Sequence, residues 1–319
     1  MSDLTVSLKE SDRVEVLTII DNYVDVLLEN TDVVTRPPHA KGGNIPTDTL
    51  LAEHGLSLLI TVYQGEKRHR ILFDTGYTQI GVPHNLDKLD VAVEEIEALV
   101  LSHGHTDHTG SLYPLLDKIP KRIPLVVHPE AFSAPRYFGL DDGRKLLFPQ
   151  TLVKADLEAR NLELLTNKTP SFLADDRVMV TGEVEHVTKF EKGLPNALME
   201  RNGKLEKDPI SDDQALLINL KGKGLVVISG CSHAGIINTI LYGIQMTGIK
   251  QVHAVLGGFH LTGPSFEPII EETIKELKKM DLKVLVPMHC TGWKAIQRFS
   301  EEFKSSFILN SVGSFFTFS

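Results

Sequence analysis

Residues 102–110, with the sequence SHGHTDHTG, are the part of this chain best suited to chemistry, because three histidines and one aspartate fall within six residues. They directly follow the apolar run 98–101, which we expect to form a buried strand. Neutral imidazoles and carboxylates are ligands that suit zinc, iron and manganese. Hydrophobic packing gives no reason to place four such side chains at one strand end. The stretch therefore predicts a metal site.

The spacing within this stretch predicts two metal positions side by side. His103 and His105 are two residues apart, so their side chains point the same way in an extended segment. Thr106 is expected to N-cap a helix whose first turn contains Asp107 and His108. Neighbouring residues on a helix diverge by about 100°. We therefore expect Asp107 and His108 to serve a different ion from the first pair.

The stretch resembles the HxHxDH signature of the metallo-β-lactamase superfamily. Other phrases are similar to the subfamily named for dihydropterin–ribofuranosylaminobenzene-phosphate synthase. They are EHGLS at 53–57, FDTG at 73–76, TGE at 181–183, GCSHAG at 230–235, GGFHL at 257–261 and MHCTG at 288–292. The resemblance implies an α/β fold, a four-layer αββα sandwich with a metal site at one edge. It also implies a transferase of methanopterin biosynthesis that moves a pterin-methyl group with loss of diphosphate.

The resemblance implies site residues outside the first stretch. The motif at 288–292 implies that His289 binds the second metal. His233 is expected to supply a ligand in place of the aspartate that this chain lacks. Many members carry a metal-bridging aspartate where this chain has Cys231. Cys231 is therefore a possible ligand, and the resemblance allows a site that holds either one ion or two. Asp74 is expected to orient ligands by hydrogen bonding. The expected metal ligands are thus His103, His105, Asp107, His108, His233 and His289, with Asp107 also catalytic.

Four further residues are candidates for binding the substrate, a small molecule that we expect to be anionic. His54 and His260 match subfamily phrases and are candidate polar contacts to a diphosphate. Phe259 and Trp293 lie near site motifs and are candidate walls for a flat ring.

The chemistry itself leaves alternatives. A divalent ion, with zinc expected first and manganese or iron as alternatives, can act as a Lewis acid or generate hydroxide from bound water. A hydrolase of an ester, lactone or phosphoester bond is therefore the alternative to the transferase. Because this chain has Cys231 in place of the bridging aspartate, a non-catalytic metal-binding sensor is a third alternative.

Composition favours one large globular domain over residues 1–319. Hydrophobic residues make up 42% and charged residues 24% of the 319 positions, which is typical of globular proteins. Two segments, 134–176 and 187–213, resist assignment and are expected to be insertions, either substrate walls or surface decoration.

The ten strand-like runs are 14–20, 56–62, 71–73, 98–101, 124–127, 178–181, 215–220, 225–229, 252–256 and 284–287. This order favours a two-sheet sandwich flanked by helices, although a single doubly wound sheet also fits.

Charge and cysteine content bear on partners and location. The net charge of −9, with no basic run, argues against nucleic acid or an acidic membrane as a partner. With only two cysteines and no signal-peptide pattern at residues 1–5, we expect a cytoplasmic protein without disulfides. No apolar run approaches the roughly 20 residues that span a bilayer. The oligomeric state is left open.

Overall fold

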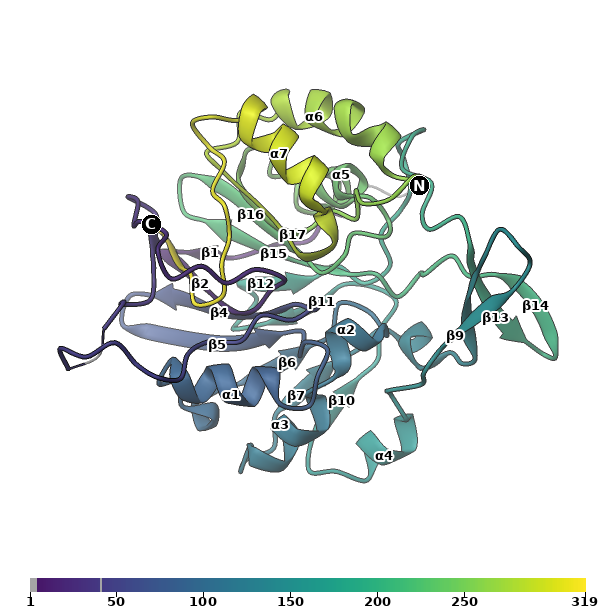
Figure 1. The fold of residues 1–319 in the computed structure, drawn as a ribbon, viewed down its shortest axis with the longest axis horizontal. Coiled ribbons are helices and arrows are strands. Elements are labelled where there is room, and N and C mark those ends of the chain that lie inside the picture. The colour runs from purple at the N-terminus through teal and green to yellow at the C-terminus, as the bar shows by residue number, and fades with distance from the viewer. Residues whose placement is uncertain (1–4, 41) are drawn as a thin grey trace.

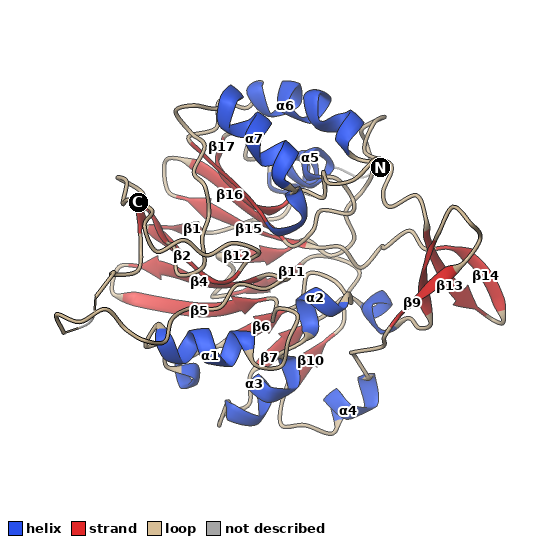
Figure 2. Ribbon diagram, in the orientation of Figure 1, coloured by secondary structure: helices blue, strands red, loops and turns tan. Residues whose placement is uncertain are grey.

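Two large β-sheets lie face to face at the centre of the structure, and helices cover the outer face of each sheet (Figures 1 and 2). The computed structural model describes residues 5–40 and 42–319. Apolar side chains from both sheets fill the space between them; Val16, Ile60 and Val226 are among those that are completely buried. Burying each such side chain contributes roughly 1.5–3 kcal/mol. The four-layer αββα sandwich expected from the sequence is confirmed, and the single-sheet alternative is wrong.

The first sheet is seven-stranded, and all of its strands except β1 lie between residues 171 and 288. Its order is β11-β12-β15-β16-β17-β18, with β1 beside β15. Strands β16, β17 and β18 are parallel, so their carboxyl ends meet at one edge. The strands are β1 (Glu10–Ser11), β11 (Ser171–Leu173), β12 (Val178–Val180), β15 (Ala215–Leu220), β16 (Gly224–Ser229), β17 (Val252–Gly258) and β18 (Val284–Met288).

The second sheet is eight-stranded, with the order β10-β7-β6-β5-β4-β2-β19-β3. Strands β5, β6 and β7 are parallel and, like the parallel strands of the first sheet, bring their carboxyl ends together. The strands are β2 (Arg13–Ile20), β3 (Val34–Thr35), β4 (Ser57–Gln64), β5 (Lys67–Phe73), β6 (Ala98–Val100), β7 (Pro124–Val126), β10 (Glu163–Leu165) and β19 (Phe315–Phe318).

The helices form the two outer layers. Helices α5 (Ile236–Thr247), α6 (Ile270–Lys278) and α7 (Trp293–Glu302) cover the first sheet, and α1 (Gly81–Lys88) and α3 (Leu112–Lys118) cover the second (Figure 1). Two shorter helices are α2 (Thr106–Thr109) and α4 (Lys154–Glu158). In the part of the chain that is described, no helix has the length and apolar character to cross a membrane.

A third, four-stranded antiparallel sheet stands beside the sandwich (Figure 1, right). It pairs two segments that are far apart in the sequence: β8 (Arg136–Gly139) and β9 (Lys145–Phe148) with β13 (Ala197–Arg201) and β14 (Lys204–Lys207). The two expected insertions therefore contribute strands to one small sheet. Strands β8 and β13 pair directly, with Tyr137 opposite Leu198.

The local expectations are confirmed with one exception. Each of the ten strand-like runs overlaps a strand of the structure, within a few residues at either end. The expectation that Thr106 caps helix α2 is wrong, because the helix begins at Thr106 and the residue before it, His105, is the N-cap. The extended backbone of His105, with ψ of 153°, makes His105 the cap, so the helix starts one residue earlier in the chain than expected.

Candidate metal centre

The candidate site lies where strands of both large sheets end. Asp74 follows β5, and the segment with His103 follows β6 of the same sheet. Cys231 follows β16 and His289 follows β18 of the facing sheet. Because parallel strands end at the same edge, the two sheets bring residues more than 200 positions apart in sequence into one site.

The candidate ligands form two groups, in each of which the ligand atoms lie within 4.8 Å of one another. The histidine group consists of His103, His105 and His233. The aspartate group consists of Asp107, His108, Cys231 and His289. The structure therefore separates the first stretch into the two pairs expected from its spacing, and each pair is joined by residues from the facing sheet.

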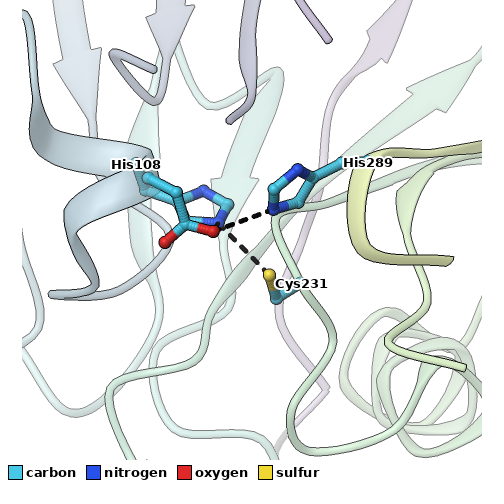
Figure 3. Close-up of side chains that lie close together, drawn as sticks. His108, Cys231 and His289 are labelled. Atoms are coloured by element: carbon cyan, nitrogen blue, oxygen red, sulfur yellow. Dashed lines mark hydrogen bonds and ion pairs between the residues drawn. The ribbon is translucent and has the colours of Figure 1, made fainter. Parts of the chain in front are cut away.

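Three side chains of the aspartate group point toward one another (Figure 3). His108 Nε2 lies 3.2 Å from Cys231 Sγ, and His289 Nε2 lies 3.2 Å from Asp107 Oδ2. The Asp107 side chain is only 16% exposed. An imidazole pair, a carboxylate and a thiol converging in this way form a suitable donor set for a divalent transition-metal ion.

Asp74 and Ser102 orient two of the histidines through hydrogen bonds to their Nδ1 atoms. The Asp74 carboxylate accepts hydrogen bonds from Ser102 N at 2.6 Å, from Ser102 Oγ at 2.7 Å and from His108 Nδ1 at 2.6 Å. Since the Ser102 hydroxyl donates to Asp74, its oxygen is left to accept from His103 Nδ1 at 2.9 Å. Both imidazoles are thereby oriented with Nε2 toward the site, where His103 Nε2 lies 2.9 Å from His105 Nδ1. Outer hydrogen bonds of this kind fix the orientation of a metal-binding histidine.

His289 is held by residues that follow β2. Its backbone N–H donates to Asp21 Oδ1 at 2.8 Å, and its Nδ1 lies 3.0 Å from Asn22 Oδ1. The same reasoning leaves Nε2 free to face the aspartate group. Asp21 and Asn22 were not expected at the site, although they directly follow the buried strand β2, as the first stretch follows β6.

A buried ion pair from the insertions supports the loop between His103 and His105. Asp212 accepts two hydrogen bonds from Arg136, at 3.0 and 2.7 Å, and a third from the backbone N–H of Gly104 at 2.8 Å. The neighbouring Asp213 accepts from Ala234 N at 2.9 Å and so holds the loop that carries His233. The insertions are thus connected to both parts of the histidine group. Neither Arg136 nor this role of the two aspartates was expected.

Burial and charge set the protonation of the site. Burial lowers the pKa of His103 and His233 well below the ordinary value and lowers that of His105 to about 4. These imidazoles are therefore neutral at pH 7, as metal binding requires. Burial also disfavours the charged form of His108, but the Asp74 and Asp107 carboxylates outweigh it and raise the pKa of His108 to about 9.

His233 provides the clearest sign that this site is built for a cation. Its side chain is buried, and neither ring nitrogen has a hydrogen-bond partner among the described residues. A buried polar group without a partner costs roughly 1–3 kcal/mol. Burial similarly raises the pKa of the Cys231 thiol, so its proton is held unless a positive charge lies nearby. A bound divalent ion would satisfy both residues, and the donor set therefore fits a metal.

The structure places the four expected substrate contacts differently. His54 is largely exposed and lies beside the aspartate group, 3.7 Å from Asp107 Oδ2. His260 is nearly buried beside His233, with ring centroids 4.4 Å apart, and Cys231, His233 and His260 form a third cluster of ligand atoms. Phe259 is buried against Phe299 in the core.

Trp293 begins helix α7 and is 75% exposed. The cavity of about 530 Å³ beside the histidine group is lined by Phe259, His260 and His233 among others, but Trp293 and His54 do not line it. Phe190, from the second insertion, does line this cavity. Sequence proximity to a site motif identified Trp293, but the start of a surface helix turns its ring away from the cavity.

Comparisons with known proteins agree with this geometry. The profile described as the metallo-beta-lactamase superfamily matches residues 54–233, which is more than half of the chain. A protein of Methanocaldococcus jannaschii named 7,8-dihydropterin-6-methyl-4-(beta-D-ribofuranosyl)-aminobenzene-5'-phosphate synthase is 35% identical over 286 residues, 88% of this chain and 94% of that protein. An uncharacterised protein of the same organism is 34% identical, over 82% of this chain and 92% of its own.

A solved structure described as a metal-dependent hydrolase of the beta-lactamase superfamily aligns with a TM-score of 0.70 and 25% identity. The alignment covers 96% of this chain and 98% of that one. Another solved structure, the metallo-beta-lactamase fold protein YhfI from Bacillus subtilis, aligns with a TM-score of 0.53 at 14% identity, over 96% of this chain and all of that one, and shares the fold.

Proposed function

We propose, from the premise that this chain belongs to the metallo-β-lactamase superfamily, that it is a metal-dependent synthase. In the proposed reaction, a ribofuranosylaminobenzene phosphate attacks the methylene carbon of a dihydropterin diphosphate, and diphosphate leaves. The observation that carries this proposal is the 35% identity to the named synthase across 94% of that protein's length. The alignment spans 88% of this chain.

The proposed metal ligands are the seven residues of the histidine and aspartate groups. The mixture of several imidazoles, one carboxylate and one thiol favours zinc over harder ions such as magnesium. With one ion in each group, Cys231 would stand where related enzymes have a bridging carboxylate. When bound, the ions supply Lewis-acid stabilisation of the charge on a departing diphosphate.

The protein's own side chains orient the metal ligands and contact the substrate. Asp74 and Ser102 keep His103 and His108 in the tautomers that face the site. Asp107 places its carboxylate in the aspartate group, 3.2 Å from His289 Nε2, and is the candidate to accept a proton from the substrate. His54 lies beside Asp107 and is a candidate contact for the diphosphate.

A hydrolase is the second candidate, and one observation favours it. The solved structure that aligns at a TM-score of 0.70 is described as a metal-dependent hydrolase. Water would then take the place of the attacking aryl amine nitrogen at the same centre, with an ester, lactone or phosphoester as substrate. We further propose that the protein acts in the cytoplasm on a small anionic molecule and binds neither nucleic acid nor membrane.

The product assay separates these candidates. Metal-loaded protein is incubated with the dihydropterin diphosphate and the ribofuranosylaminobenzene phosphate, and products are identified by mass. The synthase proposal predicts the condensed product and one released diphosphate for each. Release of diphosphate without condensation, or turnover of generic esters alone, favours the hydrolase. Absence of turnover with every substrate class would support the sensor instead.

A further inference from the structure

Two cavities meet beside the histidine group, and His260 lies at their junction. The first, of about 530 Å³, reaches His233, and the second, of about 360 Å³, extends toward strand β8. Both are lined by Pro195, His260, Ser265 and Phe266. Each volume lies in the range of about 300–1,000 Å³ that is typical of small-molecule sites. The two cavities are therefore adjacent compartments that share these four residues, and together they are called the cleft.

His260 is held at this junction in an unusual conformation. Its backbone φ of 43° lies in the left-handed region, which costs energy for a residue other than glycine. Its ring lies between two others, with centroids 4.4 Å from His233 and 4.7 Å from Phe266. Its Nδ1 is buried and has no hydrogen-bond partner among the described residues. A polar atom left in this state beside a cavity is suited to contact a ligand.

The two compartments differ in charge. Lys189 and Lys192 line the first compartment, and neither forms an ion pair with a described residue. The one acid in that lining, Glu191, accepts hydrogen bonds from the backbone N–H groups of Ile237 and Asn238 at the start of α5. Its carboxylate is thus occupied, and the lysines give the first compartment its available charge.

The second compartment has no lysine or arginine in its lining. Its walls include Phe138, Leu140, Pro264 and Phe266, and Asp141 is the acid among them. Flat apolar walls with few charges suit an uncharged ring, since stacking on an aromatic side chain buries the ring face without leaving a charge unpaired. Asp141 disfavours a phosphate group against these walls, so a diphosphate carried by the ring would face His260 and the first compartment.

We propose that the cleft binds two small molecules at once, with a phosphate ester in the first compartment and an uncharged flat ring in the second. Lys189 and Lys192 determine specificity for the phosphate, and Phe138 for the ring. This inference rests on the proposed function in taking an aryl ribofuranoside 5'-phosphate and a dihydropterin as the two molecules. Both compartments open toward His260, so the two molecules meet next to the histidine group. A hydrolase of a single substrate has no need of this division.

The first experiment tests simultaneous binding on the full-length, metal-loaded protein by calorimetry. The probes are 4-(β-D-ribofuranosyl)aminobenzene 5'-phosphate and 6-hydroxymethyl-7,8-dihydropterin, which lacks the leaving group and cannot react. We expect the affinity for each probe to be unchanged, or increased, when the other is saturating. Competition between the two probes would overturn the inference.

The second experiment tests the lysines. In the double variant Lys189→Ala, Lys192→Ala we expect the affinity for the phosphorylated riboside to fall about tenfold, because charge-assisted hydrogen bonds are lost. Affinity for the same riboside without its phosphate should not change. The matched control is Lys204→Ala, Lys207→Ala on the exposed strand β14, whose lysines line neither compartment. An equal effect of both double variants, or no effect of the first, would overturn the assignment.

The outcomes distinguish this inference from the proposed function. Simultaneous binding without formation of product from the reactive diphosphate would refute the synthase but support the two-compartment cleft. Competition between the probes with product formation intact would refute the cleft and support the synthase. No binding of either probe at millimolar concentration would refute both.

Discussion

The Asp74 carboxylate accepts a hydrogen bond from His108 Nδ1 at 2.6 Å, and both side chains are completely buried. This contact joins the end of β5 to helix α2 and sets which nitrogen of His108 faces the aspartate group. Asp74 is therefore a positioning residue that acts on the proposed centre through His108 and Ser102.

We expect Asp74→Asn to lower metal affinity by about 10–100-fold, since an outer carboxylate both orients and polarises its histidine. The measurement is a competition titration with a chelator of known affinity, accompanied by a thermal melt of the metal-free protein. The control is Asp117→Asn at the surface. Unchanged metal affinity in a folded Asp74→Asn variant would show that the contact is only structural.

We expect Asp107→Ala to reduce turnover much more than stability. The side chain lies at the open end of the aspartate group, so little packing is lost, whereas loss of a metal ligand removes several kcal/mol of transition-state stabilisation. Turnover should fall at least about a hundredfold, which corresponds to about 2.7 kcal/mol. Melting of the metal-free variant should stay close to wild type. An active variant would contradict the assignment of Asp107.

Arg136→Met is expected to destabilise the protein by about 3–5 kcal/mol, because it leaves the buried carboxylates of Asp208 and Asp212 without their cation. Chemical denaturation gives the unfolding free energy. Arg144→Met, at an exposed pair on the same small sheet, serves as control and should change stability by less than about 1 kcal/mol. Similar losses in the two variants would mean that the buried pair does not support the loop of the histidine group.

These examples show what the sequence could and could not predict. The ligand stretch and the strands before it could be predicted, because strand ends and residue types are local properties. The Arg136–Asp212 pair could not, since its partners are 76 positions apart and lie in insertions without periodicity. Trp293 is not among the residues that line the cavity beside the histidine group, and nearness in sequence to His289 does not fix the direction of a side chain at a helix start.

Glu191 gives a pH dependence of stability. Burial raises its pKa to about 7 from an ordinary value of 4.5, although it accepts two backbone hydrogen bonds at the start of α5. The folded state thus binds a proton more tightly than the unfolded state. Its contribution to stability is fully present below pH 4.5 and is lost as pH rises through 7.

The corresponding measurement compares wild type with Glu191→Gln, which cannot titrate. From pH 5 to pH 8 we expect the unfolding free energy of wild type to fall relative to the variant by roughly 3 kcal/mol. Chemical denaturation at four or five pH values gives the difference. A difference that is constant, or that grows in favour of wild type with rising pH, would contradict this prediction.

If the histidine group and the aspartate group each hold a metal ion, the protein binds two ions per chain, and elemental analysis measures this number. Elemental analysis of protein purified without chelator and reconstituted with zinc should give two equivalents in wild type. His233→Ala and His289→Ala should each retain about one, since each removes a ligand from one group only. Less than about a tenth of an equivalent in wild type, with no gain on reconstitution, would contradict the account, as would equal metal content in wild type and both variants.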